Sequence, residues 1–149
     1  MHLAPWIRTN MALLNGIQHM LFKNGLIDHE YIEKHVVGLD DLKEKIKDYS
    51  PETVQSITGV PVDKLDLADQ VISKTTSLLS TCLQDVYQSN QATASACQVI
   101  NINPSRGCIG KPGSGILQMN DSRQLKTTVK LDVMASILAS GTTVCLFPD

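Results

Sequence analysis

The sequence predicts an α/β chain that is mostly helical and contains one or two strands. Three observations support this class. Apolar residues recur at helical spacing through the first half of the chain, capping residues precede several of these segments, and a short β-tolerant segment follows them. With 149 residues, the chain has room for one domain with a modest hydrophobic core.

The first predicted helix covers Thr9 to Lys23. Its apolar residues keep the period of an amphipathic helix, and they are Leu13, Leu14, Ile17, Met20 and Leu21. Asn24-Gly25 follows directly and supplies a C-terminal stop, because glycine readily adopts the left-handed conformation that ends many helices.

A capping residue also marks the second helix. Asp28 precedes a helix predicted to run through Ile32 and His35, and an aspartate side chain can accept a hydrogen bond from the free backbone N–H groups of a first turn. Gly38 then separates this segment from a helix predicted over Asp40 to Lys47.

The next start signal is the strongest in the chain. Ser50 can cap a helix, Pro51 fits the first helical position, and Glu52 faces the positive end of the helix dipole. This helix is expected to stop near Gly59.

Pro61 and Asp63 open a further predicted helix. Its apolar residues are all expected to face inward, and they are Leu65, Leu67, Ala68, Val71 and Ile72.

The last regular elements are a strand and a helix. Ser77 to Leu83 alternates poorly but tolerates β structure, so we expect a buried strand there. Ala92 to Ile102 is rich in small residues and predicts a closely packed helix. Pro104 is expected to end it, and Gly107 to Gly115 is expected to form a turn.

Composition excludes several classes of function. A net charge of -2 gives no electrostatic basis for binding nucleic acid or an anionic membrane. No apolar run reaches the roughly 20 residues that a membrane span needs. The first residues also lack the pattern of a secretory signal peptide, so a cytoplasmic location is expected.

The four cysteines do not form a metal-binding pattern. No two of the cysteines form a CxxC pair or another compact ligand spacing, since they lie at positions 82, 97, 108 and 145. We therefore expect buried free thiols rather than a zinc site, an iron–sulfur site or disulfides.

Other chemically suggestive residues have simpler interpretations. Gly110, Gly113 and Gly115 resemble a phosphate-binding loop only superficially, because no Walker GKS/T sequence follows, and a turn with unusual φ angles explains them. His19 lies near an apolar helix face and is interpreted as a packed or surface histidine rather than a catalytic base.

The most informative segment is Gln84 to Asn120, which reads QDVYQSNQATASACQVININPSRGCIGKPGSGILQMN. It resembles the molybdopterin-dependent oxidoreductases, the family of prokaryotic nitrate reductases and formate dehydrogenases. It looks most like the assimilatory nitrate reductase branch, where GxYQSNQATAAxxQVNN, RGxIGKPGxG and LQMNGQP run in this order. Thr9 to Gly16 (TNMALLNG) and Tyr49 to Pro61 (YSPETVQSITGVP) extend the resemblance.

The resemblance covers roughly Leu3 to Asn120. It implies that residues 1–120 are an internal fragment cut from the multi-domain molybdopterin oxidoreductase fold. It also implies bis-molybdopterin guanine dinucleotide as the cofactor of the parent family, which this fragment alone is not expected to retain.

The resemblance further implies which residues contact that cofactor. Arg8, Thr9 and Asn10 take the place of a loop that holds a guanine-nucleotide part, although Asn10 replaces a residue that is usually Asp. Gln84 and Gln88 take the place of the loop that contacts the pterin. The alternatives are a helix N-terminal role for Asn10 and ordinary loop polarity for the two glutamines.

Asp85 departs from a residue that is usually glycine in the family, and its side chain and charge disfavour close approach of an anionic cofactor.

The resemblance assigns no catalytic or metal-binding residue to this chain. The family's molybdenum ligand and its [4Fe–4S] cysteines lie upstream of the matching segments, and Cys82, Cys97 and Cys108 do not match them. We therefore expect a protein of oxidoreductase ancestry that is inactive alone, with nitrate and formate both open as ancestral substrates. The alternatives are a small interaction module that pairs with the remaining portion of a split catalytic subunit, and a complete small enzyme.

The resemblance stops after Asn120. The family continues GQPTAQNNRE, and this chain does not. However, codons for Lys126 to Thr142 can be chosen so that the same nucleotides, read in the frame that starts one nucleotide earlier, encode QNNRETGCDGEYPGFRN. This coincidence predicts that residues 121–149 are an out-of-frame tail. The alternative is a divergent amphipathic helix with an apolar face of Val129, Val133, Ala135, Ile137 and Leu138.

Overall fold

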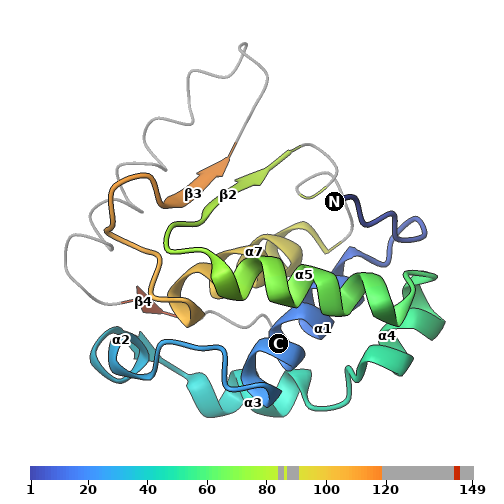
Figure 1. The fold of residues 1–149 in the computed structure, drawn as a ribbon, viewed down its shortest axis with the longest axis horizontal. Coiled ribbons are helices and arrows are strands. Elements are labelled where there is room, and N and C mark those ends of the chain that lie inside the picture. The colour runs from blue at the N-terminus through green and yellow to red at the C-terminus, as the bar shows by residue number, and fades with distance from the viewer. Residues whose placement is uncertain (84–85, 87–90, 119–142, 145–149) are drawn as a thin grey trace.

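The computed structural model describes residues 1–83, 86, 91–118 and 143–144. These residues form six helices and four short strands, so the chain is α/β and mostly helical, as predicted (Figure 1). The helices are α1 (Asn10–Lys23), α2 (His29–His35), α3 (Leu39–Ile46), α4 (Pro51–Thr58), α5 (Val62–Lys74) and α7 (Ala92–Ser105). The strands are β1 (Val36–Val37), β2 (Leu79–Cys82), β3 (Gly115–Gln118) and β4 (Thr143–Val144).

Helix α1 is the centre of the helical layer. It contacts α3, α4, α5 and α7. The apolar stripe expected on α1 forms much of the core, whose buried members are Leu13, Ile17, Met20, Leu21, Val54, Val60, Leu65 and Ile102. Gly16 of α1 permits the approach of α4, because a Cβ built on it would meet Val54 Cγ2 at 2.4 Å.

The predicted caps of α2 and α4 are confirmed. The Asp28 carboxylate accepts a hydrogen bond from the Tyr31 backbone N–H at 3.0 Å. The Ser50 hydroxyl accepts one from the Thr53 N–H at 3.3 Å, and Pro51 occupies the first turn. Both helices therefore begin where a side chain replaces a missing intrahelical partner.

The end of α4 also fixes the N-terminal segment. Gly59 has a φ of 73°, and a Cβ added to it would lie 2.6 Å from Trp6 Cε2. The Trp6 N–H donates to the Thr58 carbonyl at 2.9 Å. Trp6 therefore crosses the C-terminus of α4 where only glycine leaves room for its ring.

The prediction that all apolar residues of α5 face inward is wrong for two of them. Leu67 and Val71 are 47% and 45% exposed, whereas Leu65 and Ala68 are buried. Residues four apart share a helix face, and the face carrying Leu67 and Val71 points away from α1 and α4. The side of α5 that turns inward instead includes the buried Asp69.

Strands β2 and β3 form a two-stranded parallel sheet in which Leu79 pairs with Gly115 and Cys82 with Gln118. The expected strand within residues 77–83 is thus confirmed, although only Cys82 of its side chains is fully buried. Helix α7 packs on this sheet.

The side chain of Asn103 holds α7 to the sheet. Its amide nitrogen donates to the carbonyls of Leu78 and Gly115 at 3.0 and 2.8 Å, and its oxygen accepts from the Ser80 hydroxyl at 2.6 Å.

The prediction that Pro104 ends α7 is also wrong, because the helix continues through Pro104 to Ser105. A proline in the last turn removes one backbone donor but leaves the carbonyls before it free to accept. The Cys108 N–H donates to the Asn103 carbonyl at 2.8 Å, and the Ser105 hydroxyl donates to the Asn101 carbonyl at 2.7 Å. The turn expected after the helix is present.

A second parallel pair joins β1 to β4, with Val36 opposite Thr143 and Val37 opposite Val144. The rest of the tail, including Lys126 to Thr142, lies outside the described residues. Among the helices of the described ranges, none combines the length and apolarity that crossing a bilayer requires.

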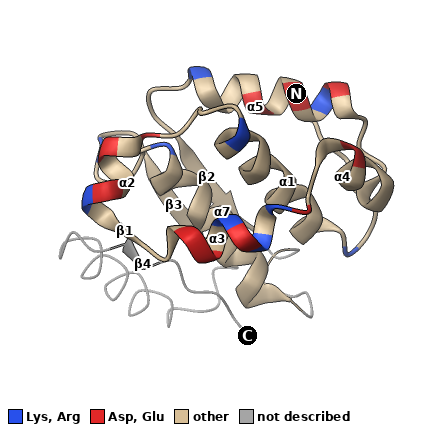
Figure 2. Cartoon of the chain, turned by 90° about the horizontal axis from the view of Figure 1, so that it is seen from below, with Lys and Arg blue, Asp and Glu red and all other residues tan. Residues whose placement is uncertain are grey.

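Charge is distributed unevenly over the fold. Figure 2 shows acidic and basic residues on α2, α3 and α5 and an acidic residue on α4, whereas α7, β2 and β3 contain no charged residue. On α2 and α3 these charges form surface pairs such as Lys34 with Glu30 and Lys43 with Asp40.

Candidate functional site

Helices α1 and α7 run parallel and in register. The Gln18 Nε2 of α1 donates to Gln98 Oε1 of α7 at 2.7 Å. At the other end, the Arg106 guanidinium donates to the Leu26 carbonyl. The two residues of each hydrogen-bonded pair are 80 positions apart in the sequence. The two helices therefore run in the same direction and begin at the same end of the molecule.

Strands β2 and β3 run toward the end of the molecule where α1 and α7 begin. Asn103, near the end of α7, contacts the beginnings of β2 and β3, so the carboxyl ends of both strands lie toward the start of α7. Figure 1 shows both strands directed to the side where the N-terminal segment lies. Ligands of open parallel sheets bind beyond the carboxyl ends of the strands. This end, formed by the starts of α1 and α7 and the carboxyl ends of β2 and β3, is the candidate site.

A tight turn leads the chain into α1. The Thr9 N–H and hydroxyl both donate to the Trp6 carbonyl, at 3.2 and 2.7 Å. Arg8 adopts a left-handed φ of 69° and is exposed. Asn10, the first residue of α1, is half-buried. Thr9 therefore stabilises the turn rather than capping the helix.

The two helices that begin at this end differ from the other described helices. Neither Thr9 nor Gln91, their N-cap residues, makes a side-chain capping bond, and neither first turn contains an acid. Helices α2 to α5 all carry Asp or Glu in the first turn, and α2 and α4 are also capped. The positive dipole ends of α1 and α7 are thus left uncompensated by their own residues, an arrangement suited to an anion.

The structure places the predicted site residues as follows. Arg8, Thr9 and Asn10 lie together at the start of α1. Gln84 and Gln88 lie outside the described residues, as does Asp85. The described residues that flank the amide-rich loop, Cys82 on β2 and Gln91 before α7, place both ends of that loop at the candidate site.

Sequence reasoning missed the start of α7 as part of this site. The absence of acids from the first turns of α1 and α7 was readable in the sequence, but the shared location of the two starts was not. It also missed a buried amide cluster between these helices, in which Asn101 Nδ2 donates to Gln98 Oε1 at 3.4 Å. Asn15 Oδ1 and Gln18 Oε1 belong to this region and are buried without a hydrogen-bond partner.

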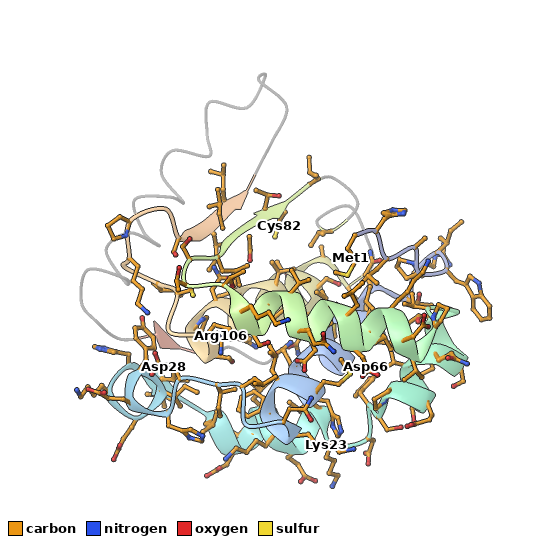
Figure 3. The ribbon with its side chains drawn as sticks, viewed as in Figure 1. Met1, Lys23, Asp28, Asp66, Cys82 and Arg106 are labelled. Atoms are coloured by element: carbon orange, nitrogen blue, oxygen red, sulfur yellow. The ribbon has the colours of Figure 1, made fainter. Side chains whose placement is uncertain are left out.

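A second polar junction lies at the opposite end of α1 and α7. Arg106, labelled in Figure 3, donates to the Ser73 carbonyl at 2.7 Å as well as to Leu26. Asp69 accepts from Asn24 Nδ2 at 2.9 Å, and burial raises the pKa of its carboxyl. This junction is structural, because it ties α1, α5 and α7 together away from the candidate site.

The described cysteines and glycines behave as expected. Cys82 and Cys108 are buried free thiols and Cys97 is half-buried; burial raises the pKa of the Cys82 and Cys97 thiols. Gly110 and Gly113 adopt φ angles of 80° and 76° in an exposed turn.

The ring nitrogen Nδ1 of His19 lies 3.0 Å from the Ile46 carbonyl oxygen. Among the residues that the structure describes, no cluster of three or more His, Cys, Asp or Glu could hold a metal ion.

Known proteins resemble this chain in sequence and in fold. No family model matches the chain. A nitrate reductase of Synechocystis is 35% identical over 115 residues, which are 77% of this chain and 16% of that protein. Formate dehydrogenase H of Escherichia coli is 26% identical over 116 residues, or 78% of this chain and 16% of the relative.

A solved structure, acetylene hydratase from Pelobacter acetylenicus, matches the fold. Its TM-score is 0.61 at 23% identity, covering 70% of this chain and 14% of that protein. This chain thus spans about a sixth of the length of the curated relatives it matches. The chain is therefore a homologue of one part of the molybdopterin-dependent oxidoreductases, a family whose members extend far beyond the region it covers.

Proposed function

We propose that this chain is a cofactor-binding segment of a nitrate reductase-like molybdopterin oxidoreductase and that it turns over no substrate alone. One observation carries the proposal. The starts of α1 and α7 and the carboxyl ends of β2 and β3 converge at one end, and both loops that resemble the family's cofactor loops begin or end there. The resemblance favours assimilatory nitrate chemistry, and the cytoplasm is the location expected from the first residues of the sequence.

The residues at this end fit the chemistry of a guanine dinucleotide. The pyrophosphate of such a cofactor is anionic, and two uncompensated helix N-termini with the exposed Arg8 beside one of them offer positive potential. Asn10 can accept one hydrogen bond from a guanine N–H, but it brings no negative charge, so this contact is weaker than an aspartate would make.

Amide side chains suit the pterin part of the cofactor. A pterin presents donors and acceptors side by side, and Gln84 and Gln88 can satisfy both kinds. The bis-molybdopterin guanine dinucleotide, when bound, supplies the redox chemistry at molybdenum, and the protein binds and orients it.

This region alone is not expected to react with nitrate or formate. The family's molybdenum ligand and [4Fe–4S] cysteines lie outside the matching segments. A cofactor held by one part of a multi-domain fold also loses most of its polar contacts and its preorganised surroundings. The chain therefore contributes contacts to the cofactor and needs further polypeptide for catalysis.

A direct experiment is to express the chain in a host that makes the cofactor and to assay the purified protein. We expect no turnover of nitrate or formate with a reduced dye, and substoichiometric pterin by fluorescence after oxidation. Turnover accompanied by bound molybdenum would overturn the inactive assignment.

Anion binding can be tested without turnover. In a ¹⁵N-labelled chain titrated with inorganic pyrophosphate, the amides of Asn10, Met11 and Ala92 should shift first. Arg8→Gln should weaken these shifts, and the matched control Lys47→Gln, directly after α3, should not. Shifts that follow surface lysines instead would contradict the assignment.

We also propose that residues 121–149 arise from a one-nucleotide deletion. The family motif MNGQPTAQ can be encoded with AAT GGA CAG CCG ACA GCT CAA after its methionine codon. Removing one G gives AAT GAC AGC CGA CAG CTC AAA, which encodes Asn120 and then Asp121 to Lys126 as they stand. The parent frame, which lies one nucleotide before the frame that encodes Lys126 to Thr142, continues as QNNRETGCDGEYPGFRN.

The gene sequence tests this proposal. A neighbouring frame that encodes GQPTAQNNRE beside Asn120 is expected, and codons that fail to give it would refute the deletion.

A further inference from the structure

Trp6 presents an aromatic ring that is held on one side and open on the other. Its backbone N–H donates to the Thr58 carbonyl at 2.9 Å, and its indole lies against Gly59, where an added Cβ would come within 2.6 Å of Cε2. The residue is nevertheless 62% exposed. The fold therefore holds a large aromatic ring at a fixed place and leaves it uncovered, although burying such a ring would be favourable.

The same residue belongs to the turn that leads into α1. The Thr9 N–H donates to the Trp6 carbonyl at 3.2 Å, which closes a four-residue turn and keeps the Cα atoms of its two ends within about 7 Å. Arg8, the third residue of this turn, is exposed, and α1 begins directly afterwards at Asn10 without an acid in its first turn. An aromatic ring, a guanidinium group and an uncompensated helix N-terminus thus all lie within residues 6–10.

The charge of this segment indicates the class of ligand. Residues 1–27 contain Arg8 and Lys23 but no aspartate or glutamate. An apolar protein segment would cover the ring without using the Arg8 charge, whereas a nucleotide offers an aromatic base to the ring and anionic phosphates to Arg8 and the helix start. Stacking of a base on an aromatic side chain contributes about 1–3 kcal/mol.

We propose that Trp6 stacks on the guanine base of the cofactor's nucleotide and thereby adds a contact that the resemblance does not assign. The phosphates of that nucleotide then face Arg8 and the start of α1. This inference rests on the proposed function, which supplies guanine as the base. The combination of an aromatic ring and positive potential suits a purine nucleotide in general.

The fluorescence of Trp6 tests the proposal directly, because Trp6 is the single tryptophan of the chain. Titration of the full chain with GDP should quench this fluorescence saturably, after correction for absorption by the nucleotide, because a stacked base contacts the ring. Inorganic pyrophosphate carries no base and should shift the amides of Asn10 and Met11 while leaving the fluorescence unchanged. Absence of saturable quenching by GDP, or equal quenching by pyrophosphate, would overturn the proposal.

Substitutions separate stacking from a structural role of Trp6. With affinity measured from the Asn10 amide shift, Trp6→Leu should weaken GDP binding by at least about fivefold, and Trp6→Phe, which keeps an aromatic face, should retain affinity within about threefold. Neither variant should change the affinity for pyrophosphate or the circular dichroism spectrum. Equal losses of GDP affinity from both variants, or a parallel loss of pyrophosphate affinity, would overturn the stacking role.

Matched controls remove exposed apolar side chains that lack an aromatic face. Ile7, the neighbour of Trp6, is 92% exposed, and Leu67 on α5 is 47% exposed. Ile7→Ser and Leu67→Ser should leave the GDP affinity unchanged. A loss from Ile7→Ser as large as that from Trp6→Leu would assign the segment to general apolar contact and overturn the role of the ring.

Failure of the proposed function remains distinguishable. GDP binding through Trp6 by a chain that acquires no pterin when grafted into the Synechocystis nitrate reductase would contradict the cofactor role and leave the stacking site standing. Pterin uptake together with a GDP affinity that is indifferent to Trp6→Leu would contradict the stacking site alone.

Discussion

Helices α2 to α5 and the unit formed by α7, β2 and β3 belong to one fold but meet their surroundings differently. The four helices carry an acid in every first turn and surface ion pairs such as Lys34 with Glu30. The α7 unit carries no charge, starts its helix without a side-chain cap, and leaves leucines of its sheet exposed. The first region therefore presents charged side chains to water, whereas the second presents an uncapped helix start and exposed leucines.

The two regions differ in whether their own side chains or contacts with other segments satisfy their polar groups and cover their apolar surface. A capped, charged helix satisfies its own backbone groups, but most helical stability still comes from packing, here against α1. The α7 unit depends on buried amides and on surfaces that its own residues leave open. Each of the following changes probes one side of this contrast.

The largest effect is expected from Asn103→Ala. Asn103 is fully buried and makes three hydrogen bonds that join α7 to both strands. Losing them removes one donor each from the Leu78 and Gly115 carbonyls, of which Leu78 keeps the Gly115 N–H, and should cost about 3 kcal/mol of unfolding free energy. Urea denaturation followed by circular dichroism measures this, and Ser80→Ala, which removes one bond, should cost about 1 kcal/mol. Equal costs for both variants would mean that Asn103 is not the main link to the sheet.

Gly59→Ala should destabilise the junction between α4 and the N-terminal segment. Its φ of 73° strains any side chain, and the new Cβ would strike the Trp6 ring. We expect a loss of about 2–3 kcal/mol, against about 1 kcal/mol for Gly25→Ala, whose similar φ of 65° faces open space. Similar losses in thermal denaturation would show that Trp6 does not pack there in solution.

Capping variants compare the two regions directly. Ser50→Ala should cost about 1 kcal/mol because it removes the cap of α4, whereas Thr9→Ala should cost only a few tenths because Thr9 does not cap α1. The comparison uses chemical denaturation of both variants at the same pH. A Thr9→Ala cost equal to that of Ser50→Ala would contradict an open start of α1.

Asp69→Asn should change how stability depends on pH. Burial raises the pKa of Asp69 in the folded state, so the folded state holds its proton at higher pH than the unfolded state. Stability from this group is therefore present below the unfolded pKa and falls as pH rises through the folded pKa. Asp69→Asn should remove that fall and be modestly more stable at neutral pH. A steeper fall in the variant's denaturation midpoint with rising pH would contradict this.

The sequence predicted the elements whose signals are local. Asp28 and Ser50 marked helix starts, and the apolar spacing of α1 marked its buried face. It could not show that Leu67 and Val71 face away from the core, because that depends on which side of α5 the neighbouring helices cover. The parallel pairing of β2 with β3 depends on contacts between segments far apart in the chain.

The candidate site was predictable only in pieces. Arg8, Thr9 and Asn10 were found through a resemblance, and the missing acids in the first turns of α1 and α7 were readable from sequence. Their convergence follows from the shared offset of Gln18–Gln98 and Arg106–Leu26, which only a structure reveals. The cofactor contacts of Arg8, Thr9, Asn10, Gln84 and Gln88 all stay predictions.

The most direct measurement grafts residues 1–118 of this chain into the Synechocystis nitrate reductase in place of its 115 matched residues and determines the pterin content of the purified chimera. The proposed function predicts near-stoichiometric pterin in the chimera and a clear reduction when the graft carries Arg8→Glu. A chimera that folds like its parent by circular dichroism but contains no pterin would contradict the claim that this chain is a cofactor-binding segment.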